Sequence, residues 1–458
     1  MKLHEKPDYS IANALDNPEK FAEEVDKLIE AYPSYLGRLI RDLRASLMQC
    51  TSEKALKLIK EIVKKSNKKD ILLEIAKLLI EDAFEKNLIP VDYKDELWEV
   101  IDGILKKLDK LEIGDRILLK DICCHDVYGS IISNLEGSAI ACLILYTFWL
   151  KKNNKIKDLN SIPEVKGKLE YYLNKQTSVI IHAVYGFYLH LLLYTDEHWT
   201  KDMIPKIFPK DRVEHLWGAW CAYVQATYLY YEAYSLLRDI YAYAVENMKY
   251  DAESECKKDS VHHLAVLYGW GIMSLDDPVF HKFWEKANSD VREKFISYIG
   301  QQLLKYELPG DVIQRFKTLW EWRISYIKGL SNRQDFQKEL KSFIHWFVSK
   351  RFDDKWALEN LTKTVELVDE ITDEHVYSAL DVLVEMANEF PELVLKYIDL
   401  LTHNASERIL NSYKRKIRKS VEEISKILKS KGRSDLEKEL KKIKETINLK
   451  LGRKVFSD

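Results

Sequence analysis

Apolar residues recur with the period of an α-helix along almost the whole chain. One early stripe places apolar side chains three or four positions apart, at Phe21, Val25, Leu28 and Ile29. A second stripe runs from Leu36 to Leu47, after a break at Pro33. No stretch keeps the strict alternation of apolar and polar residues that marks a half-buried strand. The pattern therefore predicts an all-α protein with about 20 helices of about 12–20 residues each.

Prolines and capping residues predict where many of these helices begin. Asn17 and Pro18 suit the cap and the first position of a helix, because a proline there leaves no N–H unpaired. Four prolines are expected at or just before the first residue of later helices: Pro163, Pro278, Pro309 and Pro391. Ser434 and Glu437 have the spacing of a capping box ahead of the last apolar stripe.

The order of the predicted helices favours a repeat array. Consecutive helices joined by short polar turns, with no strands to cover, stack into a bundle or a solenoid. Helix pairs recur about every 35–45 residues, which is the range of helical-hairpin repeats. No tetratricopeptide signature recurs at its period of about 34 residues. We expect an irregular α-solenoid, a helical-hairpin repeat array of the TPR or HEAT kind, and a compact multi-bundle protein is the alternative.

Composition agrees with a soluble helical chain and shifts twice along it. The 458 residues carry a formal net charge of −2, so the chain as a whole is not attracted to nucleic acid or anionic membrane. Residues 116–350 hold nine of the 11 Trp, whereas the part before them is rich in Lys, Glu, Leu and Ile. These shifts predict N-terminal helical repeats over 1–115, an aromatic-rich helical region over 116–330, and C-terminal repeats over 331–458 that end in a basic helix.

The basic end of the chain admits two interpretations. From Asn411 onward, 16 Lys and Arg stand against seven Asp and Glu. Runs such as Lys414–Lys416 could grip phosphate groups. Interspersed Glu residues and a regular Leu/Ile stripe favour an ordinary solvated helix face.

Targeting signals and cysteines predict a cytoplasmic protein. Met1–Asp16 is polar and lacks the apolar core of a secretory signal. The six cysteines show no framework spacing, which fits a reducing compartment where thiols act as small core residues. Gln176–Thr195 is free of charge over 20 residues, the length of a membrane span, but its amphipathic neighbours favour a buried central helix. Within it, His182, Gly186 and His190 share one face, and we expect Gly186 to permit close helix packing.

No motif predicts catalysis, a metal or a cofactor. The glycines lack the spacing of a P-loop, and Gly269 and Gly271 lack the third glycine and the preceding strand of a dinucleotide fingerprint. Cys123–Asp126 reads Cys-Cys-His-Asp, yet no further ligands complete a site. We therefore predict a non-enzymatic protein without cofactor or metal. A metal-dependent phosphohydrolase centred on His125 and Asp126 is the enzymatic alternative.

Aromatic residues supply the candidate binding surface. Between Tyr223 and Tyr250 there are eight tyrosines, and two of them fall off the stripe with core spacing. Trp and Arg gather again near residue 320. Because Tyr, Trp and Arg dominate interface hot spots, we predict that a protein partner is contacted by Tyr228, Tyr231, Trp320, Trp322 and Arg323. Burial in the core is the alternative for both groups.

Four blocks of packing residues follow one another over about 180 of the 458 residues. They run from Asp126 to Trp149, from Ile162 to Trp199, from Ile207 to Tyr223 and from His263 to Gly300. In order and spacing they resemble the helical C-terminal region of the antiviral STAND NTPases (Avs or AVAST proteins) and related large prokaryotic defence proteins.

The resemblance implies a function in recognition. In that family the helical region binds a conserved phage protein such as the large terminase or the portal, a P-loop module oligomerises, and an N-terminal effector acts. This chain would then be a sensor, either part of a larger protein or a stand-alone relative with associated NTPase and effector modules. The implied partner is a phage structural or packaging protein rather than a membrane or nucleic acid. A helical scaffold or adaptor for host proteins is the alternative.

Overall fold

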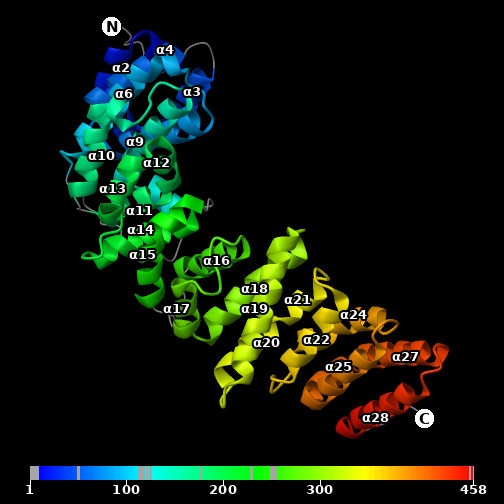
Figure 1. The fold of residues 1–458 in the computed structure, drawn as a ribbon. Coiled ribbons are helices and arrows are strands. Elements are labelled where there is room, and N and C mark those ends of the chain that lie inside the picture. Colours follow the sequence, from blue (N-terminus) through cyan, green and yellow to red (C-terminus); the bar gives the residue numbers. More distant parts are fainter. Residues whose placement is uncertain are drawn as a thin grey trace. The chain divides into compact units, whose positions relative to one another are not determined.

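The computed structural model describes residues 10–48, 52–111, 119, 122, 126–175, 178–226, 231–247, 255–452 and 455–456. All regular elements in these ranges are helices, so the predicted all-α class is confirmed (Figure 1). The chain divides into two compact units. Unit 1 contains residues 1–240 with 254–256, and unit 2 contains 241–253 with 257–458.

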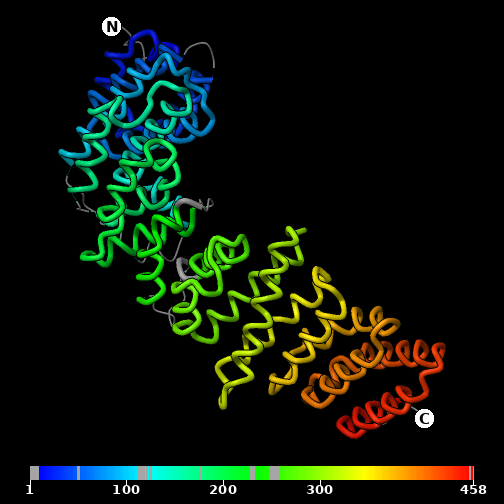
Figure 2. The backbone as a smooth tube through the Cα atoms, in the orientation of Figure 1, coloured from blue at the N-terminus to red at the C-terminus, as the bar shows by residue number. Residues whose placement is uncertain are grey.

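In its described residues, unit 1 is a succession of helices (Figures 1 and 2). They are α1 (Ile11–Asp16), α2 (Pro18–Ala31), α3 (Tyr35–Leu47), α4 (Ser52–Lys65), α5 (Lys69–Leu78), the π-helix η1 (Leu79–Glu85), the 3-10 helix η2 (Val91–Tyr93), α6 (Lys94–Leu108), α8 (Val127–Ile132), α9 (Leu135–Lys152), the 3-10 helix η3 (Leu159–Ser161), α10 (Pro163–Lys175), α11 (Val179–Phe187), α12 (Leu189–Thr195), α13 (Glu197–Ile207) and α14 (Val213–Gln225). The next helix, α15 (Tyr231–Asn247), begins in unit 1 and ends in unit 2.

Helix α9 forms the centre of unit 1. It is apolar on all sides and most of its residues are buried, which is typical of a helix enclosed by others. Helices α5, α6, α10, α11 and α12 all pack against it. Its one buried thiol, Cys142, donates to the carbonyl of Ala76 at 3.3 Å, as expected of a core cysteine. Cys221 on α14 is disulfide-bonded, so the expectation of reduced thiols is wrong at this residue.

The expected central helix is two helices. Its described part, from Ser178 to Thr195, is divided at Tyr188 between α11 and α12, and most of its side chains are buried. Gly186 has the predicted packing function, since a Cβ added there would lie 2.1 Å from the carbonyl oxygen of Ala219 on α14. Among the described residues, no helix combines the length and apolarity needed to cross a bilayer.

The regular elements of unit 2 are also helices in the described residues. Its helices are α16 (Glu255–Gly269), α17 (Pro278–Lys286), α18 (Ser289–Lys305), α19 (Gly310–Lys328), the 3-10 helix η4 (Gln334–Phe336), α20 (Gln337–Ser342), α21 (Ile344–Val348), α22 (Asp354–Val365), α23 (Asp373–Tyr377), α24 (Ala379–Met386), α25 (Pro391–Asn404), α26 (Glu407–Ser412), α27 (Lys414–Ser430) and α28 (Ser434–Lys450).

These helices form two layers with a regular period. In one layer α19, α22, α25 and α28 pack in succession, and in the other α18, α21, α24 and α27 do so. Helices α21, α24 and α27 begin 35 residues apart, at Ile344, Ala379 and Lys414. Ion pairs repeat the same offset, since Lys350 pairs with Glu385 and Lys416 pairs with Asp381. Unit 2 is therefore a helical repeat array with the short period that the sequence indicated.

Most predicted helix starts are confirmed, and one is wrong. Pro18, Pro163, Pro278 and Pro391 are first residues of helices, and α19 begins directly after Pro309. The capping box at Ser434 and Glu437 is not formed. Arg433 occupies the cap position of α28, Ser434 is already helical, and no side chain caps this end.

Candidate partner-binding surface

The predicted contact residues of α19 lie mainly in the core. Trp320 is buried, its indole N–H donates to the Thr364 hydroxyl at 3.0 Å, and its ring stacks on Phe343 at 5.0 Å between centroids. Arg323 is buried as well, with its guanidinium 4.2 Å from the ring centroid of Trp284. The prediction that these two side chains contact a partner is therefore wrong for this structure, because neither reaches the surface.

A buried charge cluster fixes Arg323 in place. Glu339 accepts two hydrogen bonds from one edge of the Arg323 guanidinium, from Nε at 2.5 Å and from Nη2 at 3.0 Å. A second arginine, Arg292, lies 3.3 Å from the same carboxylate. Burial lowers the pKa of Arg292, and the nearby Glu339 opposes this change. The cluster gives α18, α19 and α20 a common polar anchor inside unit 2, so its role is structural.

Trp322 is the predicted residue that the structure does bring toward the surface. Its side chain is half-buried, and its ring lies 6.4 Å from that of Tyr326, which is 49% exposed. The ring of His281 on α17 lies 6.0 Å from that of Trp322, centroid to centroid. Tyr228 and the side chain of Tyr231 lie outside the described residues.

An apolar hollow of unit 2 lies between α16, α18 and the start of α19, with a volume of about 340 Å³. Apolar residues form most of its lining. At its rim, Trp270 is 57% exposed and Tyr306 is 46% exposed. Phe316 of α19 belongs to its wall. We call this feature the aromatic hollow, defined by Trp270, Tyr298, Tyr306, Pro309, Val312 and Phe316.

The end of α16 presents Trp270 to solvent. The helix stops because Gly271 adopts a φ of +73°, a conformation that side chains other than glycine rarely take. The N–H of Ile272 then returns to the carbonyl of Leu267 at 2.9 Å, which closes the turn. Arg315 of α19 donates to the carbonyl of Gly269 at 2.9 Å and holds this turn against α19. Trp270 is thus exposed on a well-anchored backbone.

The opposite wall of the hollow is held by ring stacking. Tyr298 stacks on His262, with centroids 4.1 Å apart and planes inclined by 19°. Burial raises the pKa of Tyr298, and the neighbouring Tyr306 adds to this shift. The phenol therefore stays neutral at physiological pH, and the hollow carries Glu307 as its one charged lining residue. Such a lining suits an apolar side chain of a partner rather than a polar substrate.

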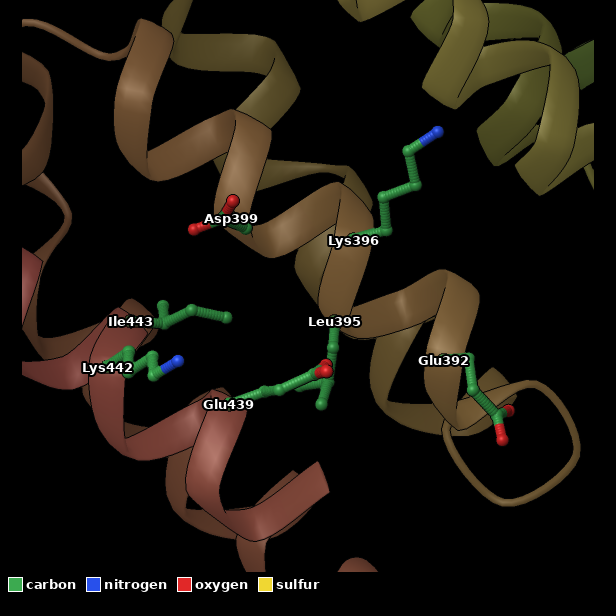
Figure 3. A pocket seen from close by; sticks show the side chains of 7 residues that line it. All are labelled: Glu392, Leu395, Lys396, Asp399, Glu439, Lys442 and Ile443. Carbon is green, nitrogen blue, oxygen red and sulfur yellow. The ribbon is translucent and has the colours of Figure 1, made fainter. Parts of the chain in front are cut away.

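A second hollow lies between α25 and α28 and is lined largely by charged side chains. Its volume is about 280 Å³. Figure 3 shows Leu395 and Ile443 directed into the gap, whereas Lys396 and Glu392 point away from it. Those two charges are engaged elsewhere, since Lys396 pairs with Glu366 at 2.7 Å and Glu392 with Arg433 at 2.6 Å. This groove is therefore the seam between two neighbouring repeats.

The residues considered for catalysis or metal binding are used in other ways or lie outside the described ranges. Asp126 caps α8 by accepting the N–H of Tyr128 at 3.1 Å, and His125 with both adjacent cysteines lies outside the described residues. His182 is buried, and burial lowers its pKa to about 4. In the part of the chain that the structure describes, no three His, Cys, Asp or Glu side chains form a group able to hold a metal.

Sequence reasoning missed the aromatic hollow because its walls come from segments up to about 50 residues apart. One local signal was present. The Gly-Trp-Gly run at 269–271 is a poor nucleotide fingerprint, but it is a good helix-ending sequence that exposes the residue between its glycines.

Comparison with known proteins does not place the chain in a family. No protein-family model matches the chain, and no curated protein matches it. A solved structure described as a circular tandem repeat protein with novel repeat topology and enhanced subunit contact surfaces aligns over 97% of this chain and 95% of its own, at 12% identity and a TM-score of 0.27. A likeness this weak carries no conclusion about function.

Proposed function

We propose that the protein is a non-enzymatic recognition array that binds a protein partner through the aromatic hollow of unit 2. The observation that carries this proposal is the exposure of Trp270 and Tyr306 at the rim of one apolar hollow. A third large apolar side chain, Leu304, is half-exposed and lies on the last turn of α18, two residues before Tyr306. Clustered exposed aromatic and aliphatic residues on a folded protein mark interaction sites.

Energetics favour this hollow as an anchor point. Trp and Tyr are the residue types that most often dominate the free energy of protein association. The turn that carries Trp270 is already ordered by the Gly271 conformation and by the Arg315 hydrogen bond. A preordered anchor loses little conformational entropy on binding, so more of its contact energy contributes to affinity.

The resemblance to STAND NTPase sensors supports a narrower partner class. In this proposal the partner is a folded phage protein such as the large terminase or the portal, met in the cytoplasm of an infected cell. A helical repeat array can read the shape of such a partner over an extended surface. The NTPase and effector functions would belong to other modules of the same system.

Co-elution on size exclusion with purified phage large terminases and portals tests the proposal. We expect a stable complex with at least one of them, with an affinity of about micromolar or better. The double variant Trp270→Ala/Tyr306→Ala should weaken that complex by about 2 kcal/mol or more, a loss of about thirtyfold. Tyr32→Ala, which removes an exposed tyrosine of unit 1, is the matched control and should bind normally.

Two results would overturn the proposal. Absence of a complex with every phage protein, from a folded and monodisperse sample, removes the antiviral partner class. A complex that forms equally well with the double variant removes the aromatic hollow as its anchor.

A further inference from the structure

A third hollow, in the last repeat of unit 2, is lined by lysines. It lies between α27 and α28 and has a volume of about 270 Å³. Asn448 closes one end of it, because its side-chain oxygen accepts the N–H groups of Val455 at 2.7 Å and Phe456 at 3.0 Å. We call it the lysine hollow, defined by Ser425, Lys429, Glu437, Leu440, Lys441, Lys444, Glu445, Asn448 and Phe456.

The lysines of this hollow differ from other basic residues of the same repeat. In the described part of the chain, Lys429, Lys441 and Lys444 have no carboxylate within 4.0 Å. By contrast, Lys416 pairs with Asp381 at 2.7 Å and Arg418 pairs with Glu422 at 2.8 Å. The hollow thus holds three lysines, none of which forms a close ion pair with a carboxylate of the described residues.

The surroundings add to the positive potential. The segment from Asn411 to the end has 16 basic residues against seven acidic ones. Burial lowers the pKa of Lys444 and the nearby Lys429 lowers it further, whereas Glu422 and Glu437 oppose the shift. A bound anion would relieve the repulsion between the two ammonium groups and return the pKa of Lys444 toward its usual value.

The lining also limits the charge of the ligand. Glu437 and Glu445 face the same hollow, so its three lysines and two glutamates leave one net positive charge. One carboxylate balances that charge, whereas a phosphate dianion or a nucleic-acid strand would meet repulsion from the two glutamates. Leu440 and Phe456 supply apolar surface for the methylene groups of an acidic side chain.

We propose that the lysine hollow binds the carboxylate of a Glu or Asp side chain on a protein partner. The site is a second contact, separate from the aromatic hollow, and assigns the partner an acidic residue. That the carboxylate belongs to a protein partner rests on the proposed function. The anion site itself is tested without any such partner.

The test uses the full chain labelled with ¹³C at its lysine side chains, followed by NMR. The probe is the blocked tripeptide acetyl-Ala-Glu-Ala-amide, and acetyl-Ala-Gln-Ala-amide is its neutral match. We expect the Glu peptide to shift the Lys444 signal in a saturable way and to raise the pH midpoint of its titration. The Gln peptide should do neither. Lys444→Arg assigns the signal.

Paired charge variants separate a site from diffuse attraction. Lys429→Gln/Lys441→Gln removes two hollow lysines, and Lys419→Gln/Lys438→Gln removes two exposed lysines of the same helices that do not line the hollow. We expect the first pair to weaken Glu-peptide binding about fivefold or more. The second pair should change it less than about twofold, because those lysines do not line the hollow and salt screens charges that do not contact the ligand.

Three results would overturn the inference. Equal losses in the two double variants would show diffuse attraction to a basic surface. Equal shifts from the Gln peptide, or none from either peptide, would remove the anion site. Tighter binding of inorganic phosphate than of the Glu peptide would show that the site does not select a carboxylate. A positive result stands even if no phage protein binds the chain.

Discussion

Arg323 and Glu339 form a two-pronged ion pair with both side chains fully buried in unit 2. The guanidinium also lies over the Trp284 ring, at 4.2 Å from its centroid, so its faces contact aromatic carbon while its edge meets the carboxylate. Arg292 adds a second positive charge at 3.3 Å from Glu339. Removing the carboxylate would leave two arginines buried without an anionic partner.

We therefore expect Glu339→Gln to destabilise unit 2 strongly. Breaking a buried ion pair by removing one partner costs about 3–5 kcal/mol, because the remaining charge stays desolvated. The free energy of unfolding from urea titration measures this loss. Asp311→Asn is the control, since it breaks the exposed Asp311–Arg315 pair and should cost less than about 1 kcal/mol. A loss for Glu339→Gln no larger than that of the control would contradict the prediction.

Helix positions in this protein were predictable, and the burial of α19 was not. Periodicity and proline placement fixed starts such as Pro18 and Pro391, because those signals are local. Trp320 and Arg323 looked alike as interface candidates, yet both are buried by residues far along the chain, Thr364 and Glu339 among them. A single sequence cannot reveal that an arginine has a buried carboxylate partner 16 residues away.

Histidine burial predicts a loss of stability in mild acid. His375 is buried, its Nδ1 lies 2.8 Å from the Thr372 hydroxyl, and burial lowers its pKa to about 3, with Lys341 and His345 adding to the shift. The unfolded chain binds a proton near pH 6.5, whereas the folded unit does not. Stability contributed by neutral His375 is therefore present above pH 6.5 and is lost as the pH falls toward 3.

Urea unfolding of unit 2 at several pH values checks this effect. From pH 6.5 downward we expect His375 to contribute a decline of about 1.4 kcal/mol per pH unit. His375→Asn should flatten the profile by that amount, whatever its cost at neutral pH. His403→Gln, which removes an exposed histidine of the same unit, should leave the slope as it is. An unchanged slope in His375→Asn would refute the assignment.

Close packing of α11 against α14 depends on the absence of a side chain at residue 186. A Cβ there would lie 2.1 Å from the Ala219 carbonyl oxygen, which belongs to backbone and cannot rotate away. Gly186→Ala should therefore destabilise unit 1 by about 1–3 kcal/mol or more.

Gly167→Ala is a matched control, because nothing lies within 4 Å of the added Cβ on α10. It should stabilise the helix by about 0.5–1 kcal/mol. Thermal and urea unfolding measure the change in stability of each variant. A loss of stability in both variants would contradict this account.

Residue composition predicted the region of the candidate site but not its individual residues. Aromatic enrichment marks residues 116–350, and both Trp270 and Tyr306 of the proposed site lie there. Choosing among those aromatics needed the helix ends, because Trp270 is exposed by the turn at Gly271 while Trp320 is covered from several sides. The lysine hollow was harder to predict, because a sequence does not show which lysines form ion pairs and which do not.

Two ion pairs of unit 2 each join residues 35 positions apart, and they differ in burial. Lys416 has a largely buried side chain, lies 3.9 Å from the Tyr377 ring centroid and pairs with Asp381 at 2.7 Å. Lys350 pairs with Glu385, which also lies 35 residues away, but here the lysine belongs to the earlier repeat and both side chains are well exposed. Partial burial strengthens both the ion pair and the cation–π contact. We expect Lys416→Met to cost about 1–2 kcal/mol and Lys350→Met less than about 0.5 kcal/mol in urea unfolding at low salt. Equal costs in the two variants would show that the repeat offset alone, and not burial, sets the strength of these pairs.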